Sequence, residues 1–184
     1  MEDAMSIREN IDKVLVTEEQ IRVRSKELGE QITNDYAKEN KAPLLVALLR
    51  GSVPFLAELI KHIDLDIQYD FMDVTSYEGT RSTGDIKILK DLDTSIVGKD
   101  ILLVEDIVDT GRTVQAVKGM LANKGAASVK IVTLLDKPSK RVCDVNADYV
   151  GFEIDDYFVV GFGLDYDQRY RALPFVGVLK ADQY

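Results

Sequence analysis

The chain has 184 residues, of which 46% are hydrophobic and 30% are charged, and its formal net charge is −9. These values predict one folded domain over residues 1–184 rather than a disordered chain, and the acidic balance disfavours general binding to nucleic acid. No apolar run approaches the roughly 20 residues needed to cross a bilayer. The single cysteine, Cys143, fits a reducing compartment. We therefore expect a cytoplasmic protein that binds neither nucleic acid nor membranes.

The first predicted elements are a helix, a strand and a second helix. Residues 17–20 are typical of a capping box, and apolar residues at roughly helical spacing predict a helix after it. Residues 43–49 are apolar without alternation, as in a parallel strand buried on both faces. That strand ends at residues 50–52, and Pro54 then opens the second helix.

The next predicted elements are two strands, at residues 67–74 and 86–89. The stretch between them is polar, contains two glycines and shows no periodicity, so we expect an exposed lid loop over residues 75–85. A strand at residues 101–104, a loop at 109–113 and a helix then follow. Further apolar runs predict strands at residues 129–135, 149–153, 158–162 and 175–179.

This order of elements predicts an α/β fold with a mostly parallel central sheet flanked by helices. Ligands of such sheets bind beyond the carboxyl ends of the strands. We therefore expect the loops at residues 50–52, 105–113 and 136–138 to share one crevice.

The segment VEDIVDTGRT at residues 104–113 carries the most chemical information. Its second half lies between a predicted strand and helix, where backbone N–H groups, two threonine hydroxyls and a glycine can cradle a phosphate. It matches neither a Walker loop nor a dinucleotide fingerprint. Glu105, Asp106 and Asp109 would repel a phosphate unless sugar hydroxyls or Mg²⁺ intervene. The combination suggests a phosphorylated ribose, whereas an isolated Asp-Thr-Gly would indicate an acidic turn that caps a helix.

This segment resembles the phosphoribosyl pyrophosphate motif of the type I phosphoribosyltransferases. Other segments narrow the resemblance to the hypoxanthine (hypoxanthine-guanine) phosphoribosyltransferases, and they follow in the family's order from about Ile11 to Lys180. They are LRGS at 49–52, SY at 76–77 with STGD at 82–85, LLDKP at 134–138, FVVGFGLDY at 158–166 and YRALP at 170–174. The resemblance implies the type I phosphoribosyltransferase fold, with a small hood subdomain from about residues 1–16 and 150–184.

The resemblance also implies a Mg²⁺-dependent enzyme of purine salvage. Such an enzyme transfers the 5-phosphoribosyl group from phosphoribosyl pyrophosphate to N9 of hypoxanthine or guanine, giving IMP or GMP and pyrophosphate. Relatives are dimers or tetramers, which implies a homo-oligomer. Xanthine, orotate or uracil as the base, and a non-catalytic regulator that binds nucleic acid, are the alternatives. The preference among hypoxanthine, guanine and xanthine stays open, because it depends on backbone geometry at the C2 edge of the base.

The family pattern gives the acidic motif its roles. Glu105 and Asp106 resemble the pair that holds the ribose hydroxyls, directly or through a metal-bound water. Asp109 matches the catalytic group at purine N7, where a carboxylate can accept a proton or stabilise charge as N9 attacks C1′. The residues implied to hold the 5′-phosphate are Asp109, Thr110, Gly111, Arg112 and Thr113, and many relatives carry Lys in place of the Arg.

For the base, the resemblance implies three residues. Lys137 resembles the purine-selecting lysine, whose ammonium only donates hydrogen bonds and so suits a 6-oxo group and mismatches the 6-amino group of adenine. Phe158 is implied to stack on the purine, with the backbone of Val159 at its C2 edge. Without the resemblance, Lys137 would be interpreted as a solvated side chain and Phe158 as a core aromatic.

For pyrophosphate, the resemblance implies contacts from Arg171 and from a loop formed by Leu49, Arg50 and Gly51. In the family that loop has a non-proline cis peptide before its basic residue, which is commonly Lys.

Asp165 is implied to bind Mg²⁺ opposite the pyrophosphate, with Glu105 and Asp106 assisting. Ser76 and Tyr77 resemble the lid that excludes water from the reacting centre. Because the chain is acidic and the implied substrate is a polyanion, we expect substrate binding to depend strongly on the metal. His62 is expected at the surface, and no catalytic or metal role is expected for it or for Cys143.

Overall fold

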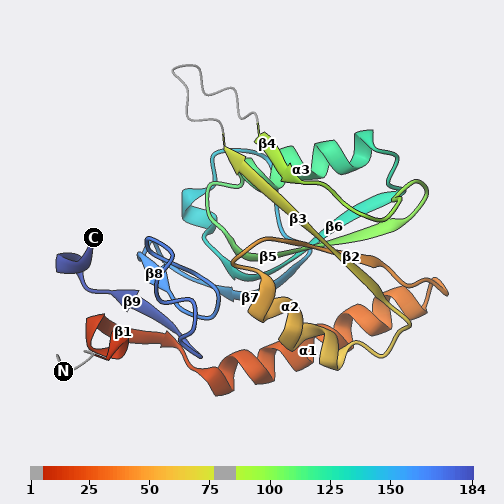
Figure 1. The fold of residues 1–184 in the computed structure, drawn as a ribbon. Helices are drawn as coiled ribbons and strands as arrows, with labels where there is room; N and C mark the ends of the chain where they lie inside the picture. Colours follow the sequence, from red (N-terminus) through yellow and green to blue (C-terminus); the bar gives the residue numbers. More distant parts are fainter. Residues whose placement is uncertain (1–5, 77–85) are drawn as a thin grey trace.

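The computed structural model describes residues 6–76 and 86–184, which form two β-sheets and their flanking helices (Figure 1). The strands are β1 (Ile11–Val16), β2 (Leu44–Leu48), β3 (Gln68–Ser76), β4 (Ile86–Lys90), β5 (Asp100–Val108), β6 (Ser128–Asp136), β7 (Tyr149–Glu153), β8 (Val159–Val160) and β9 (Val176–Leu179). The α-helices are α1 (Glu18–Ala37), α2 (Val53–Leu59) and α3 (Arg112–Asn123), and the 3-10 turns are η1 (Ile7–Asn10), η2 (Ile60–His62), η3 (Pro138–Lys140) and η4 (Ala181–Gln183).

The larger sheet has six strands in the order β4-β3-β2-β5-β6-β7. All of its strand pairs are parallel except β3 with β4. This confirms the predicted α/β fold with a mostly parallel sheet. A 20-residue helix, α1, begins at the predicted capping box, in which Thr17 and Gln20 bond each other's backbone N–H groups.

The core lies on both faces of this sheet. All five residues of β2 are buried, and alternate side chains point to opposite faces, as the pleat of a strand requires. Leu45 and Ala47 pack in the cluster that includes α1 and α2, whereas Leu44 and Val46 pack in the cluster that includes α3. Figure 1 shows α1 and α2 below the sheet and α3 above it. The carboxyl ends of β2, β5 and β6 therefore open at one edge, between the two helical layers.

The smaller sheet joins the two ends of the described chain in the order β1-β9-β8, with antiparallel pairs. It corresponds to the expected hood, although residues 150–153 lie in β7 and so in the larger sheet. The strand expected at residues 158–162 is shorter, because β8 ends at Val160. Gly161, Phe162 and Gly163 then have φ values of 99°, 48° and 99°, and this left-handed backbone turns the chain out of the sheet.

The lid expected at residues 75–85 begins at the end of β3. Thr75 and Ser76 are the last residues of that strand, and Ile86 begins β4, its antiparallel partner. Tyr77 and the rest of the loop lie outside the described residues. None of the described helices is both long and apolar enough to span a membrane.

Candidate active site

The predicted phosphate cradle lies between the end of β5 and the start of α3. Residues 105–111, 113 and 114 line a cavity of about 210 Å³. Gly111 precedes the first residue of α3 and has a φ of 83°. A Cβ at this position would lie 2.6 Å from Cγ1 of Val145 and 2.8 Å from Cδ of Arg141. The position therefore needs glycine for its backbone conformation and for the close packing behind the loop.

The expected pyrophosphate loop lies directly against the acidic motif. The Leu49–Arg50 peptide bond is cis, as the family resemblance implies. A Cβ on Gly51 would lie 1.6 Å from Oδ2 of Asp106, and a Cβ on Gly163 would lie 1.9 Å from the carbonyl oxygen of Gly51. Three segments that are distant in the sequence thus meet at one edge of the sheet.

Two arginines lie beside these segments and share one glutamine. Arg171 Nη2 lies 2.9 Å from Oδ1 of Asp165 and 3.1 Å from Oε1 of Gln168. Arg50 Nη1 donates to the same Oε1 at 3.3 Å, and Arg171 Nη1 donates to the carbonyl of Gly163 at 2.6 Å. The residues expected at pyrophosphate and metal therefore form one connected cluster. Gln168 was not expected from the sequence, because it lies outside the segments that carry the resemblance.

Lys137 lies next to Asp109, although they come from different loops. The lysine is 5% exposed, and its Nζ donates to the carbonyl of Tyr157 at 2.7 Å. The same Nζ lies 3.7 Å from Oδ2 of Asp109 and 3.7 Å from Oδ1 of Asp156. A cation that only donates and a carboxylate that only accepts thus lie side by side. Without the family resemblance Lys137 would be interpreted as a solvated side chain, and its burial shows that this interpretation is wrong.

Phe158 follows the carbonyl that Lys137 contacts, at the entry to β8. The residue is 39% exposed rather than part of the core, so it offers an aromatic surface near the lysine. Val159 is buried in β8, where it pairs with Val178 of β9.

Arg141 is a residue of this site that the sequence patterns did not reveal. Its guanidinium donates to the backbone carbonyl of Asp109 and pairs with the carboxylate of Asp136. The side chains of Arg141 and Asp136 are 12% and 10% exposed, so this ion pair is buried. The arginine therefore ties the Asp109 loop to the loop that carries Lys137. No local pattern marks it, because the Asp109 carbonyl lies 32 residues away in the sequence.

The acidic pair of the motif is poorly solvated. Burial raises the pKa of Glu105 well above its ordinary range, and the neighbouring charge of Asp106 adds to the effect. Burial also raises the pKa of Asp106 to about 6. The N–H of Ile107 and the charge of Arg171 oppose that shift, and the charge of Asp165 adds to it. These carboxyls are therefore groups that a cation or hydroxyl donors would stabilise in their charged form.

The two side chains for which no catalytic or metal role is expected are His62 and Cys143. His62 Nε2 lies 3.3 Å from Oε1 of Glu58, in the turn after α2. Cys143 is partly buried, and its Sγ lies 3.4 Å from the carbonyl of Thr110, behind the phosphate loop.

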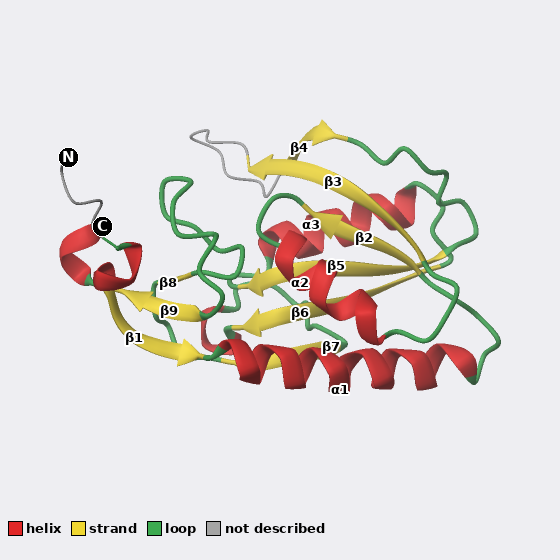
Figure 2. Ribbon diagram, turned by 60° about the horizontal axis from the view of Figure 1, so that its bottom comes forward, coloured by secondary structure: helices red, strands yellow, loops and turns green. Residues whose placement is uncertain are grey.

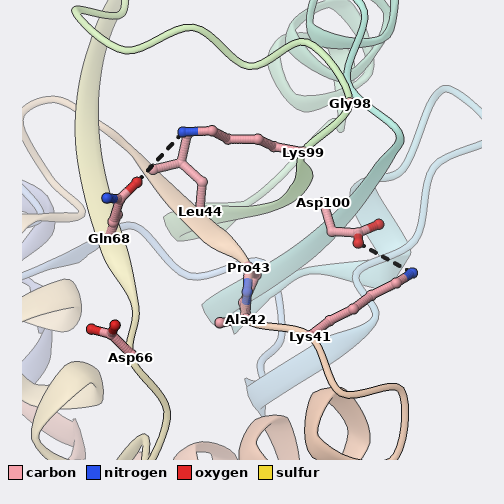
Figure 3. Close-up of a pocket in the computed structure, with 9 residues that line it drawn as sticks. All are labelled: Lys41, Ala42, Pro43, Leu44, Asp66, Gln68, Gly98, Lys99 and Asp100. Carbon is pink, nitrogen blue, oxygen red and sulfur yellow. Dashed lines mark hydrogen bonds and ion pairs between the residues drawn. The ribbon is translucent and has the colours of Figure 1, made fainter.

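A second cavity, of about 340 Å³, lies at the opposite edge of the sheet (Figure 3). Leu44, Gln68 and Asp100, the first residues of β2, β3 and β5, contribute to its lining. Its lysines already have partners, since Lys41 Nζ lies 3.2 Å from Oδ2 of Asp100 and Lys99 donates to Gln68 at 3.4 Å. The edge of the sheet at the carboxyl ends of the strands is therefore the better candidate for the active site.

Known proteins resemble this chain over nearly its whole length. Residues 15–167 match the family model described as phosphoribosyl transferase domain. The hypoxanthine-guanine phosphoribosyltransferase of Lactococcus lactis is 58% identical over 95% of this chain and 94% of its own, and that of Bacillus subtilis is 52% identical over 97% and 98%. A crystal structure of a hypoxanthine phosphoribosyltransferase from Staphylococcus aureus superimposes with a TM-score of 0.93 at 47% identity, covering 99% of each chain. The chain therefore belongs to the hypoxanthine-guanine phosphoribosyltransferases, the purine salvage enzymes of the phosphoribosyl transferase family.

Proposed function

We propose that this enzyme transfers the 5-phosphoribosyl group of phosphoribosyl pyrophosphate to N9 of hypoxanthine and of guanine, releasing pyrophosphate. The observation that carries the proposal is the 3.7 Å approach of Lys137 Nζ to Asp109 Oδ2 at the mouth of the phosphate loop. A 6-oxopurine presents an acceptor at O6 and a proton at N7 along one edge. A donor-only lysine and an acceptor-only aspartate complement that edge.

The reaction follows from these positions. N9 of the base attacks C1′, the bond from C1′ to the pyrophosphate oxygen breaks, and the N7 proton passes to the Asp109 carboxylate. The backbone N–H groups of residues 110–113 hold the 5′-phosphate at the start of α3, where the helix dipole favours an anion. Arg50 and Arg171 hold the departing pyrophosphate, and Gln168 keeps the two guanidinium groups together.

The residues present fit Mg²⁺. The charge of Asp165 raises the pKa of Asp106, and a shared cation would relieve that repulsion. Among residues 6–76 and 86–184, no three His, Cys, Asp or Glu side chains gather closely enough to hold a metal by themselves. Oxygens of the substrate would then complete the coordination, as is usual for Mg²⁺ with one or two carboxylates. When bound, Mg²⁺ neutralises charge on the pyrophosphate as it leaves.

The test of the substrate is an assay of pyrophosphate release. The enzyme is supplied with Mg²⁺, phosphoribosyl pyrophosphate and one base at a time: hypoxanthine, guanine, xanthine, adenine or uracil. We expect turnover with hypoxanthine and guanine, loss of turnover with EDTA, and strong rejection of adenine, because adenine leaves the buried ammonium unpaired. Release with none of the bases would refute the proposal, and turnover of uracil alone would refute the choice of a purine.

The test of the mechanism is a matched pair of variants, Asp109→Ala and Asp156→Ala. Each removes a carboxylate that lies 3.7 Å from Lys137 Nζ, but only Asp109 is assigned to the proton. Asp109→Ala should lower kcat by about 10²–10⁴-fold with a much smaller effect on the binding of phosphoribosyl pyrophosphate. Asp156→Ala should retain most of kcat. An unchanged kcat in Asp109→Ala would contradict the assignment.

We also propose that the enzyme is a cytoplasmic homodimer or homotetramer. The resemblance to dimeric and tetrameric relatives supports the assembly, and the single cysteine is compatible with the reducing compartment. Sedimentation velocity of the purified chain tests the oligomeric state, and a monomer at micromolar concentration would contradict it.

A further inference from the structure

Phe158 belongs to a cluster of three aromatic rings, and the proposed reaction gives no role to the other two, Tyr166 and Tyr184. The ring of Tyr184 stacks on that of Phe158, with centroids 4.6 Å apart and planes inclined by 18°. Tyr166 meets it edge to face at 5.6 Å and 86°, and it also meets Tyr184 at 6.3 Å and 70°. The three residues are 36–55% exposed, so they form a surface cluster and are not part of the buried core.

Tyr184 covers one face of the Phe158 ring. Tyr184 follows η4, and Figures 1 and 2 both show β8 between η4 and the carboxyl ends of β5 and β6. Because Tyr184 already stacks on one face of this ring, a base that stacks on Phe158 would use the opposite face. The N–H of Leu179 donates to the carbonyl of Phe158 at 3.1 Å, and this bond ties the chain leading to η4 to the start of β8. Because Phe158 is still 39% exposed, its ring keeps free surface for a ligand.

We propose that Tyr184 is a positioning residue for the purine: it stacks on one face of Phe158 and holds that ring in the plane on which the base binds. The inference rests on the proposed function and on the role that the family resemblance implies for Phe158, which is to stack on the base. A free phenylalanine ring at the surface would have to be ordered when the base binds, and that ordering reduces affinity. Tyr184 orders the ring beforehand, and offset stacking of aromatic rings is itself favourable. The bound state is a stack of Tyr184, Phe158 and purine.

The experiment compares Tyr184→Ala and Tyr184→Phe with the unmodified enzyme, using hypoxanthine at saturating Mg²⁺ and phosphoribosyl pyrophosphate. Tyr184→Ala should raise the KM for hypoxanthine by about two- to ten-fold, with kcat and the KM for phosphoribosyl pyrophosphate unchanged within two-fold. Tyr184→Phe should restore the KM, because the stacking needs the ring and not the hydroxyl. Calorimetric binding of IMP to the same variants gives a readout that does not depend on turnover, and it should weaken by a similar factor in Tyr184→Ala alone.

The matched control is Tyr69→Ala. Tyr69 is 53% exposed and meets Phe71 edge to face at 5.8 Å, but it lies at the amino end of β3, away from the site. The variant Tyr69→Ala should leave all kinetic constants unchanged. An unchanged KM for hypoxanthine in Tyr184→Ala would overturn the inference. A lower KM would also overturn it, because it would mean that Tyr184 competes with the base. If the unmodified enzyme itself turns over no 6-oxopurine, the proposed function fails rather than this inference alone.

Discussion

Replacement of Arg141 by methionine tests the most deeply buried electrostatic link of the site. The substitution keeps most of the aliphatic stem and removes the guanidinium that pairs with Asp136 and donates to the carbonyl of Asp109. Both side chains of the ion pair are nine-tenths buried or nearly so, with exposures of 12% and 10%. The variant therefore leaves a buried carboxylate without its cation.

The expected loss is about 3–5 kcal/mol in the free energy of unfolding, the usual effect of removing one partner of a buried ion pair. This is a large share of the roughly 5–15 kcal/mol that stabilises a typical domain. Urea denaturation followed by circular dichroism, with linear extrapolation, measures the change. The double variant Arg141→Met with Asp136→Leu should recover most of the loss, because no charge then remains buried. In both variants kcat should fall, since the Asp109 loop loses its anchor.

Arg22→Met provides the matched control for the same assay. Arg22 pairs with Glu19 at 2.6 Å, but their side chains are 57% and 67% exposed, so Arg22→Met should change the free energy of unfolding far less than Arg141→Met does. A loss below about 1 kcal/mol in Arg141→Met would refute the reasoning. A double variant as unstable as the single one would refute the explanation by an unpaired carboxylate.

Three further predictions concern the site itself. Lys137→Gln should lower kcat/KM for hypoxanthine by about 10–10²-fold. It should also raise the use of adenine relative to hypoxanthine, because an amide can accept as well as donate a hydrogen bond. An unchanged ratio in competition assays would contradict the role of Lys137 in base selection. Gly51→Ala should lower kcat/KM for phosphoribosyl pyrophosphate by about 10²-fold, because the new Cβ would lie 1.6 Å from Oδ2 of Asp106, and steady-state kinetics would show it. The raised pKa of Asp106, about 6 instead of 3.8, means that the folded state holds this proton more tightly than the unfolded state, so the unliganded protein should lose stability as the pH rises from about 4 to about 6. In Asp106→Asn the loss of stability with rising pH should be smaller by at most about 3 kcal/mol, and by less where solvent reaches the side chain. Urea denaturation of both proteins at about pH 4.5 and about pH 8 measures this difference. The same pH dependence in both proteins would contradict the raised pKa of Asp106.

Much of the fold could be predicted from short stretches of sequence. The capping box at Thr17, the doubly buried strand at residues 44–48 and the turn from β5 into α3 depend on residues within a few positions of one another. Backbone conformation and strand burial of this kind are local properties, so pattern and composition suffice to predict them. The phosphate loop was predictable for the same reason, because one continuous segment lines its cavity.

The structure changed the predictions where the chain leaves a simple pattern. Residues 158–162 have the apolar composition of a strand, but the left-handed backbone at residues 161–163 ends β8 after two residues. Only glycine fits at position 163, because a Cβ there would collide with the carbonyl of Gly51, a residue from another loop. The propensities of neighbouring residues cannot reveal such a collision, because it involves a residue that is distant in the sequence.

The sequence alone determined most of the elements, the phosphate loop and, through its motifs, the family and the roles expected of the segments that carry them. Only the tertiary structure decided which side chains meet: Gly51 against Asp106, Arg141 with Asp136, Gln168 between Arg50 and Arg171, and Tyr184 on Phe158. The physical reason is that most of these contacts join residues of different loops, up to 118 positions apart. Their geometry is set by strand order and register, and these arise only when the whole chain packs around one sheet.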